Sequence, residues 1–189
     1  MTDSTRVAAQ PALDPQQYRE ALGRFVTGVT VVTTLEQTQA GAQPWGTTVN
    51  SFTGVSLDPP LVLVSIGRNR AIHPIIGRTG RFGVNVLGEG SQVLSDCFAG
   101  APSAMPKDAF CGARWEASEA GLPLLEQAIA FVGCAVERTI EAGDHTLYIA
   151  RVLETAVRDE PGWPLLYFRR RYLRIERGAM AELRGKADG

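Results

Sequence analysis

The residues best suited to chemistry lie between Thr47 and Thr53, in a turn-rich segment between two β-type runs. The segment combines threonine, serine and asparagine with glycines, and the apolar run 61–66 follows it closely. Backbone N–H groups and short polar side chains of this kind can hydrogen-bond a flat ligand with a polar edge. Hydroxyl residues are also common at turns and strand edges, so a solvated strand edge is an equally good explanation on physical grounds.

Two further clusters contain arginines. Ser65 to Arg70 ends the apolar run and offers a hydroxyl, a flexible glycine and two guanidinium groups, which suits a phosphate. The other cluster pairs residues 143–145, which include His145, with Tyr167 to Tyr172, where three arginines stand among aromatic residues. That set could clamp phosphates or stack on a ring. A solvated turn and a salt-bridged strand end are the respective alternatives.

The elements that must position these clusters are mostly β-strands. A helix is expected to start at Asp14 and Pro15 and to end by Gly28, because an Asp N-cap followed by proline is a typical helix start. The segment 35–44 is expected to be a loop. Short helices are expected at 70–76, interrupted by Pro74 and closed by Gly77, and at 91–99, and a mobile loop at 100–112. Strands are expected at 29–34, 45–50, 54–57, 61–66, 82–87, 128–140, 145–157, 165–168 and 172–175.

This order of elements predicts a mainly β fold, an antiparallel barrel or sandwich with a few helices, because strands and helices do not alternate regularly. The 189 residues fit a single domain at 14–177, with a flexible arm at 1–13 and a polar tail at 178–189.

Composition excludes several classes of protein. The net charge of −1 gives no overall attraction to nucleic acid or to an anionic membrane. Neither a signal peptide nor a transmembrane run is visible. The three cysteines and two histidines form no metal-ligand pattern. The odd cysteine count predicts reduced thiols and a cytoplasmic protein.

Motifs for covalent catalysis are also missing. The chain has no Gly-x-Ser-x-Gly elbow, no Gly-x-Gly-x-x-Gly after a strand and no phosphate-binding P-loop. A nucleotide cofactor would therefore be bound outside the Rossmann scheme.

Taken in order, the segments resemble the flavin reductase-like family of FMN-binding split barrels, and most closely the short-chain reductase component of two-component flavin-dependent monooxygenases. The similarity extends from about Tyr18 to Ile175. Its markers are the segments 21–33, 46–53, 56–63, 80–87, 92–99, 143–145 and 166–169.

The resemblance implies a Greek-key split barrel, a homodimer, and FAD or FMN near the dimer interface, reduced by NADH. It implies that the flavin contacts Thr47, Thr48, Val49, Asn50, Ser51, Phe52, Ser65, Ile66, Arg68, Arg70, Ala71, Phe98 and Ala99. The nicotinamide pocket would be bounded by His145, Phe168, Arg169, Arg171 and Tyr172. Two residues depart from the family pattern: Ala71 replaces a frequent Ser or Thr, and Arg170 replaces a frequent Gly.

The implied activity is hydride transfer from a reduced nicotinamide to an exchangeable flavin, which then diffuses to a partner monooxygenase. His145 would orient the nicotinamide rather than move a proton. The choices of FAD or FMN, and of NADH or NADPH, stay open. The alternatives are a non-catalytic flavin store or sensor, a split-barrel oxidase or heme-related protein, and a structural dimeric barrel without a ligand.

Overall fold

The computed structural model describes residues 13–101, 110–158 and 162–175. The expected N-terminal arm and C-terminal tail lie almost entirely outside these residues, and so does most of the expected loop 100–112. The helices are Pro15–Leu22 (α1), Ile72–Thr79 (α2) and Gln92–Ala99 (α3). The strands are Thr27–Gly28 (β1), Thr30–Thr38 (β2), Gly41–Val49 (β3), Thr53–Leu57 (β4), Pro60–Gly67 (β5), Arg81–Leu87 (β6), Trp115–Ala117 (β7), Pro123–Leu125 (β8), Ala128–Ala142 (β9), His145–Val157 (β10), Leu166–Phe168 (β11) and Arg171–Leu173 (β12).

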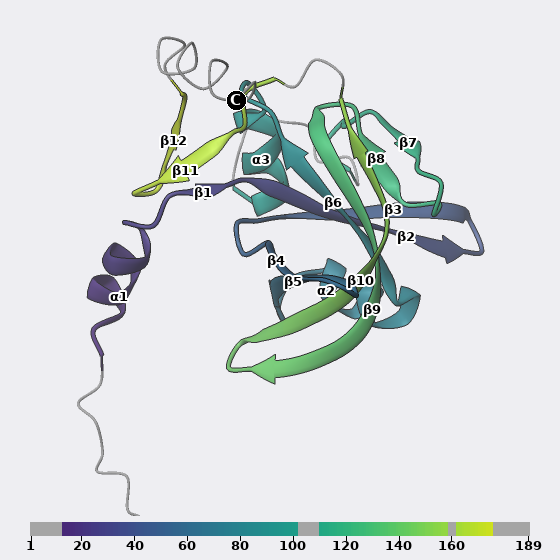
Figure 1. The fold of residues 1–189 in the computed structure, drawn as a ribbon, viewed down its shortest axis with the longest axis horizontal. Coiled ribbons are helices and arrows are strands. Elements are labelled where there is room, and N and C mark those ends of the chain that lie inside the picture. Colours follow the sequence, from purple (N-terminus) through teal and green to yellow (C-terminus); the bar gives the residue numbers. More distant parts are fainter. Residues whose placement is uncertain (1–12, 102–109, 159–161, 176–189) are drawn as a thin grey trace, which may run out of the picture.

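A seven-stranded sheet in the order β3-β2-β6-β9-β10-β5-β4 forms the body, and its neighbouring strands are all antiparallel (Figure 1). The sheet curls but does not close, and its edge strands β3 and β4 are joined by residues 50–52. The candidate segment therefore lies at the opening of a split barrel. The mainly β fold predicted from the sequence is confirmed.

A smaller sheet, β1-β11-β12, extends from the body and leads to α1, which stands apart from the barrel (Figure 1). None of the residues of α1 is buried. Asp14 caps the helix by accepting a hydrogen bond at 2.9 Å from the Gln16 backbone N–H. The helix ends at Leu22, earlier than expected, and Gly28 belongs to β1.

Two apolar clusters hold the body together. One lies under α2 and contains Val32, Phe82 and Tyr148; the other lies under α3 and contains Val31 and Leu165. Neighbouring residues of β2 thus belong to different clusters, because successive side chains of a strand point to opposite faces. The strand expected at 29–34 was recognisable from sequence because these residues are all β-branched.

The buried amide of Asn85 joins β6 to β8. Its Nδ2 donates to the Thr33 hydroxyl at 3.0 Å and to the carbonyls of Val31 and Pro123, and its Oδ1 accepts from the Leu125 N–H at 2.8 Å. These bonds satisfy both ends of a fully buried polar group. They fix the β7–β8 ribbon across one end of the barrel.

Two sequence expectations about local structure were wrong. The expected loop 35–44 is a hairpin, in which β2 and β3 pair as far as Thr38 and Gly41. Its strands are exposed at this end, so no apolar alternation marks them. Helix α2 is neither interrupted by Pro74 nor closed by Gly77: proline is tolerated in the first turn, and the helix ends at left-handed Gly80.

The expectation of reduced thiols was also wrong for two cysteines. Cys97 on α3 and Cys111 form a disulfide, with their Cα atoms 6.0 Å apart. Folding brings together two positions separated by 14 residues, and cysteine spacing alone does not show this. Cys134 is free and buried, and burial raises its pKa to about 12. In the part of the chain that the structure describes, no helix is long and apolar enough to cross a bilayer.

Candidate flavin and nicotinamide site

The connection between β3 and β4 is anchored through hydroxyl groups. The Ser51 hydroxyl donates to the Ser65 carbonyl at 2.9 Å and accepts from the Ser65 N–H at 3.0 Å. On the other side, the Thr48 hydroxyl donates to the Ser95 carbonyl of α3 at 2.7 Å. The segment is thus held between β5 and α3, so the intervening backbone is presented in one conformation.

This segment forms a cavity of about 230 Å³ with the end of β5 and the start of β10. His145 enters it because it is paired with Gly67 in the β10–β5 ladder. The lining residues are Thr47, Thr48, Val49, Asn50, Ser51, Ser65, Ile66, Gly67, Arg70 and His145. The structure therefore brings together eight of the thirteen predicted flavin contacts, together with the predicted nicotinamide-positioning histidine.

The phosphate end of the predicted site lies where β5 leads into α2. Arg70 reaches across the chain and donates from Nη1 to the Ala99 carbonyl at 2.7 Å. Ala71 occupies the N-cap of α2, and no side chain caps that helix end. The His73 N–H donates to the Arg70 carbonyl at 3.0 Å, and Pro74 has no N–H, so the guanidinium group of Arg70 is the donor here that suits a phosphate.

Four predicted flavin contacts lie outside the cavity lining besides Ala71: Phe52, Arg68, Phe98 and Ala99. Phe98 is buried in the core against Gly46, where an added Cβ would be 2.4 Å from its ring. The side chain of Arg68 braces the β9–β10 turn by donating to the Gly143 carbonyl at 2.8 Å. Phe52 also packs against a core cluster.

His145 is held by its neighbour. Its Nδ1 lies 2.7 Å from Asp144 Oδ1, and this hydrogen bond with the imidazole lowers the pKa of the Asp144 carboxyl. A carboxylate on one ring nitrogen orients the imidazole and leaves Nε2 for another partner. Both side chains are largely exposed, so His145 is accessible to a ligand.

The predicted nicotinamide residues on the β11–β12 hairpin do not lie together in one cavity. Phe168 and Arg169 line a second cavity of about 250 Å³, which also contains Phe25 and Asn50. The Tyr172 hydroxyl donates to Asp96 Oδ1 at 2.6 Å, and burial, aided by this bond, raises its pKa to about 12. Tyr172 thus anchors the hairpin to α3. Arg171 is exposed and lines neither cavity.

The hairpin and His145 do not share a cavity within the described residues; Asn50 is the residue common to both spaces. Sequence reasoning named Gly67 as a flexible residue but missed it as cavity lining, although its place after an apolar strand was a usable signal. It also missed Phe25, which nothing in the sequence links to the hairpin.

A sequence model of the family described as "Flavin reductase like domain" matches residues 22–176. The chain belongs to this family. The resemblance seen in the sequence is thereby confirmed, and the match covers the barrel, the flavin cavity and the hairpin.

Two relatives match over most of their own length. The NADH-dependent flavin reductase StyB of Pseudomonas fluorescens is 41% identical over 162 residues, covering 85% of this chain and 89% of its own. The reductase subunit HsaB of a flavin-dependent monooxygenase from Rhodococcus jostii is 38% identical over 177 residues, covering 93% and 85%. The structure of the NADH:FAD oxidoreductase SgcE6 of Streptomyces globisporus, in complex with NAD and FAD fragments, matches with a TM-score of 0.77 and 34% identity, covering 90% and 99%.

Proposed function

We infer that this chain is an NADH-dependent flavin reductase that uses FAD or FMN as an exchangeable cofactor. The observation that carries this inference is the cavity at the split of the barrel, whose hydroxyl-rich lining belongs to a chain of the flavin reductase family. The reaction needs no acid–base triad, because the bound flavin supplies the hydride-accepting ring. The protein supplies binding, orientation and exclusion of water.

The lining fits a flavin. Asn50 offers its side-chain amide at the open edge of the barrel, and the backbone of Asn50 and Ser51 lies beside it, so a polar ring edge can be hydrogen-bonded there. Arg70 offers a cationic donor for a phosphate at the end of β5. Ala71 provides no hydroxyl there, so the phosphate depends on Arg70.

His145 orients the nicotinamide carboxamide through Nε2, while Asp144 holds Nδ1. The variant H145A is expected to raise the KM for NADH more than it raises the flavin Kd. Equal loss of both would show that His145 belongs to the flavin site instead.

The activity is tested by mixing the purified protein with NADH and either FAD or FMN under air and following the nicotinamide absorbance. Rapid oxidation that requires added flavin supports the reductase, and the faster flavin identifies the preferred one. Flavin binding without NADH oxidation would favour the alternative, a non-catalytic flavin store or sensor.

The reduced flavin leaves for a separate flavin-dependent monooxygenase. This proposal is supported by HsaB, which is named as the reductase subunit of such an enzyme. Its test is a coupled assay in which the two proteins are separated by a dialysis membrane that passes flavin. Substrate oxidation across the membrane supports transfer by diffusion.

A homodimer is proposed because α1 exposes Tyr18, Leu22 and the following Phe25, which is 75% exposed. Tyr18 and Leu22 share one face of the helix because they are four residues apart, and Phe25 follows the helix end. Sedimentation measurements on the wild type and on Phe25→Ser test this proposal. The cytoplasmic location is also a proposal. The Cys97–Cys111 disulfide counts against it, because cytosolic thiols are kept reduced.

A further inference from the structure

The C-terminal half of α3 supports the flavin cavity from one side. The Ser95 carbonyl accepts a hydrogen bond from the Thr48 hydroxyl at 2.7 Å. Four residues further along the helix, the Ala99 carbonyl accepts from Arg70 Nη1, also at 2.7 Å. Thr48 and Arg70 both line the flavin cavity. The position of this half of the helix therefore decides where a wall hydroxyl and the cavity's guanidinium group lie.

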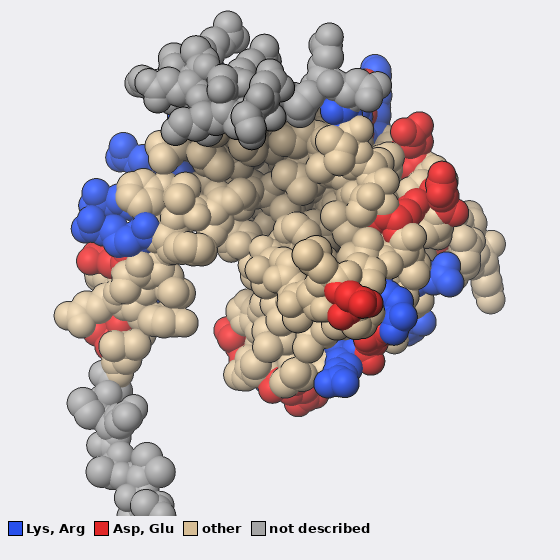
Figure 2. Space-filling view, viewed as in Figure 1, with Lys and Arg blue, Asp and Glu red and all other residues tan. Residues whose placement is uncertain are grey.

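The same half of the helix anchors the β11–β12 hairpin. The Tyr172 hydroxyl donates to Asp96 Oδ1 at 2.6 Å. The hairpin lies beside α1 and projects from the body, and blue arginine side chains gather there in Figure 2. A shift of α3 would thus be felt on the hairpin side of the candidate site as well as on the flavin side.

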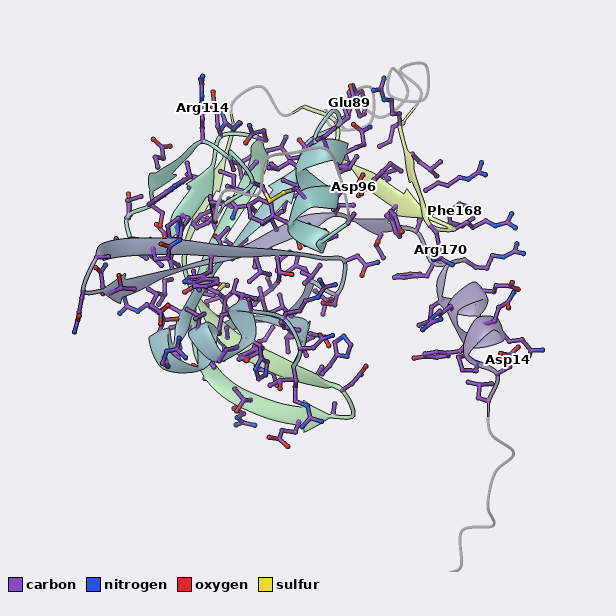
Figure 3. All side chains as sticks on the ribbon, turned by 180° about the vertical axis from the view of Figure 1, so that it is seen from behind. Asp14, Glu89, Asp96, Arg114, Phe168 and Arg170 are labelled. Atoms are coloured by element: carbon purple, nitrogen blue, oxygen red, sulfur yellow. A yellow bond between two sulfur atoms is a disulfide. The ribbon has the colours of Figure 1, made fainter. Side chains whose placement is uncertain are left out.

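Cys97 lies in the middle of this stretch of α3. Its disulfide with Cys111 ties the helix to a segment further along the chain, and Figure 3 shows the bond in yellow near α3 and the labelled Asp96. The rings of Phe98 and Phe110 meet edge to face, with their centroids 5.1 Å apart. The cross-link and the ring contact together hold residues 110 and 111 against the helix.

The backbone of Cys111 has an unfavourable conformation. Its φ of 58° lies in the left-handed region, which glycine adopts readily and other residues avoid. The covalent bond to α3 is one of the constraints that hold it there. Opening the disulfide lets Cys111 leave this conformation, and the C-terminal half of α3 then has one restraint fewer.

The two sulfur atoms differ in accessibility. Cys97 is half-buried, whereas Cys111 is buried. One accessible sulfur is enough for attack on an oxidant by the thiolate, or for attack on the disulfide by a thiol reductant. Disulfides of proteins in a reducing compartment are mostly transient and redox-sensing. The pair can therefore alternate between dithiol and disulfide.

The proposed reductase function supplies an oxidant. Reduced flavin that is not consumed by a monooxygenase passes two electrons and two protons to dioxygen, which gives oxidised flavin and hydrogen peroxide. This oxidant forms wherever the enzyme releases reduced flavin in air. A cysteine pair attached to the flavin cavity is thus exposed to a by-product of the proposed activity.

We propose that Cys97 and Cys111 form a reversible redox site that sets the flavin affinity of the cavity. The Cys97 thiolate attacks hydrogen peroxide and breaks its O–O bond, which leaves a sulfenic acid and a hydroxide ion. The Cys111 thiol attacks the oxidised sulfur, so that the S–S bond forms and water leaves. The hydroxide takes up the proton that Cys97 had lost. In total the pair loses two electrons and the peroxide becomes two molecules of water; a thiol reductant reverses the change by exchange.

The disulfide form binds flavin more tightly, because α3 is already fixed and less free energy is spent on ordering Thr48 and Arg70. A tighter site releases flavin more slowly, so less reduced flavin reaches dioxygen. Peroxide thereby limits its own formation. The source of the peroxide rests on the proposed reductase function, whereas the effect of the disulfide on flavin affinity does not.

The test compares flavin binding by the two redox forms of the whole protein. Protein reduced with dithiothreitol and freed of it is titrated with hydrogen peroxide, and thiols are counted after unfolding. The count is expected to fall from three to one, the one being Cys134. The Kd for FAD and for FMN, from fluorescence titration, is expected to be about fivefold lower in the disulfide form, the equivalent of one neutral hydrogen bond. An unchanged thiol count, or equal Kd values for the two forms, would overturn the proposal.

Cys97→Ser is the matched control, because it removes the accessible thiol and leaves the buried Cys111 and Cys134. Its flavin Kd is expected to match that of the dithiol wild type, both before and after peroxide. A peroxide-dependent Kd in this variant would refute the role of the pair. The comparison of the two wild-type forms needs no substitution, so it decides the question even if the variant does not fold.

A turnover experiment tests the source of the oxidant. Dithiol protein supplied with NADH and flavin under air is expected to lose two thiols, and catalase is expected to prevent the loss. Loss that catalase does not prevent would refute the peroxide step. Added peroxide and flavin titration need no turnover, so a failed reductase assay beside a redox-dependent flavin Kd would refute the proposed function alone.

Discussion

The Ser51 hydroxyl completes the β4–β5 ladder beyond its last backbone pair. Thr53 opposes Leu63 in that ladder, so continuing the register places Ser51 opposite Ser65. At this position the side chain replaces the backbone: one oxygen both donates to the Ser65 carbonyl and accepts from its N–H. Ser51→Ala removes both hydrogen bonds without adding volume.

The size of the effect follows from these two bonds. Each contributes about 1 kcal/mol, so the free energy of unfolding should fall by about 2 kcal/mol. For a chain of this size, that lowers the melting temperature by about 4–8 °C. Ser51 and Ser65 both line the flavin cavity. Without the two hydrogen bonds the lining is held less firmly, so flavin binding should weaken. If the free energy of flavin binding also fell by the full amount of about 2 kcal/mol, the flavin Kd would rise about thirtyfold.

Thermal unfolding and flavin fluorescence titration measure the two effects. Thr53→Ala is the matched control, because among the described residues the exposed Thr53 hydroxyl reaches only the adjacent Gly54 carbonyl, at 3.3 Å. The control should unfold and bind flavin like the wild type. Identical melting temperatures and flavin affinities for the two variants would refute the role given to the Ser51 hydroxyl.

Three other groups give separate predictions. Asn85→Leu removes the buried amide between β6 and β8 and should lower the free energy of unfolding in urea by about 3–5 kcal/mol, whereas a loss below 1 kcal/mol would contradict the described network. The pKa of Asp144 is lowered from 3.8 in the folded state, so its contribution to stability is present above that pH and is lost as the pH falls further. Asp144→Asn should therefore show a slightly shallower loss of stability below about pH 4 in urea unfolding; a curve parallel to the wild type would count against the His145 contact. Cys134 is protonated and buried, so a thiol reagent should label no thiol in the native protein, one after unfolding and three after unfolding with reduction. Three labels without reduction would mean that the disulfide is absent.

The sequence predicted the elements whose burial has a simple pattern. Strands β5 and β6 are mostly apolar, and both were expected close to their observed bounds. The outer part of the β2–β3 hairpin was missed because it is exposed and polar. The strands β1, β7 and β8 have only two or three residues, too few for any periodicity to show.

The sequence likewise predicted only part of the candidate site. The contiguous segment 47–51 was identified because its residue types are unusual between strands. Phe98 was expected to face the nucleotide, but the space left by Gly46 takes its ring into the core. The contact between Gly23 and Arg169 joins distant parts of the chain. No local pattern encodes such a contact, so the second cavity was not foreseen.

Helix α1 has eight residues and no buried side chain. A helix this short is marginal in water, and its Asp14 cap contributes only about 1 kcal/mol. Its persistence in solution therefore depends on what covers Tyr18, Leu22 and Phe25. If a second copy covers them, the helix forms as the protein associates. Helix formation and self-association are then reciprocally linked: each raises the equilibrium constant of the other by the same factor.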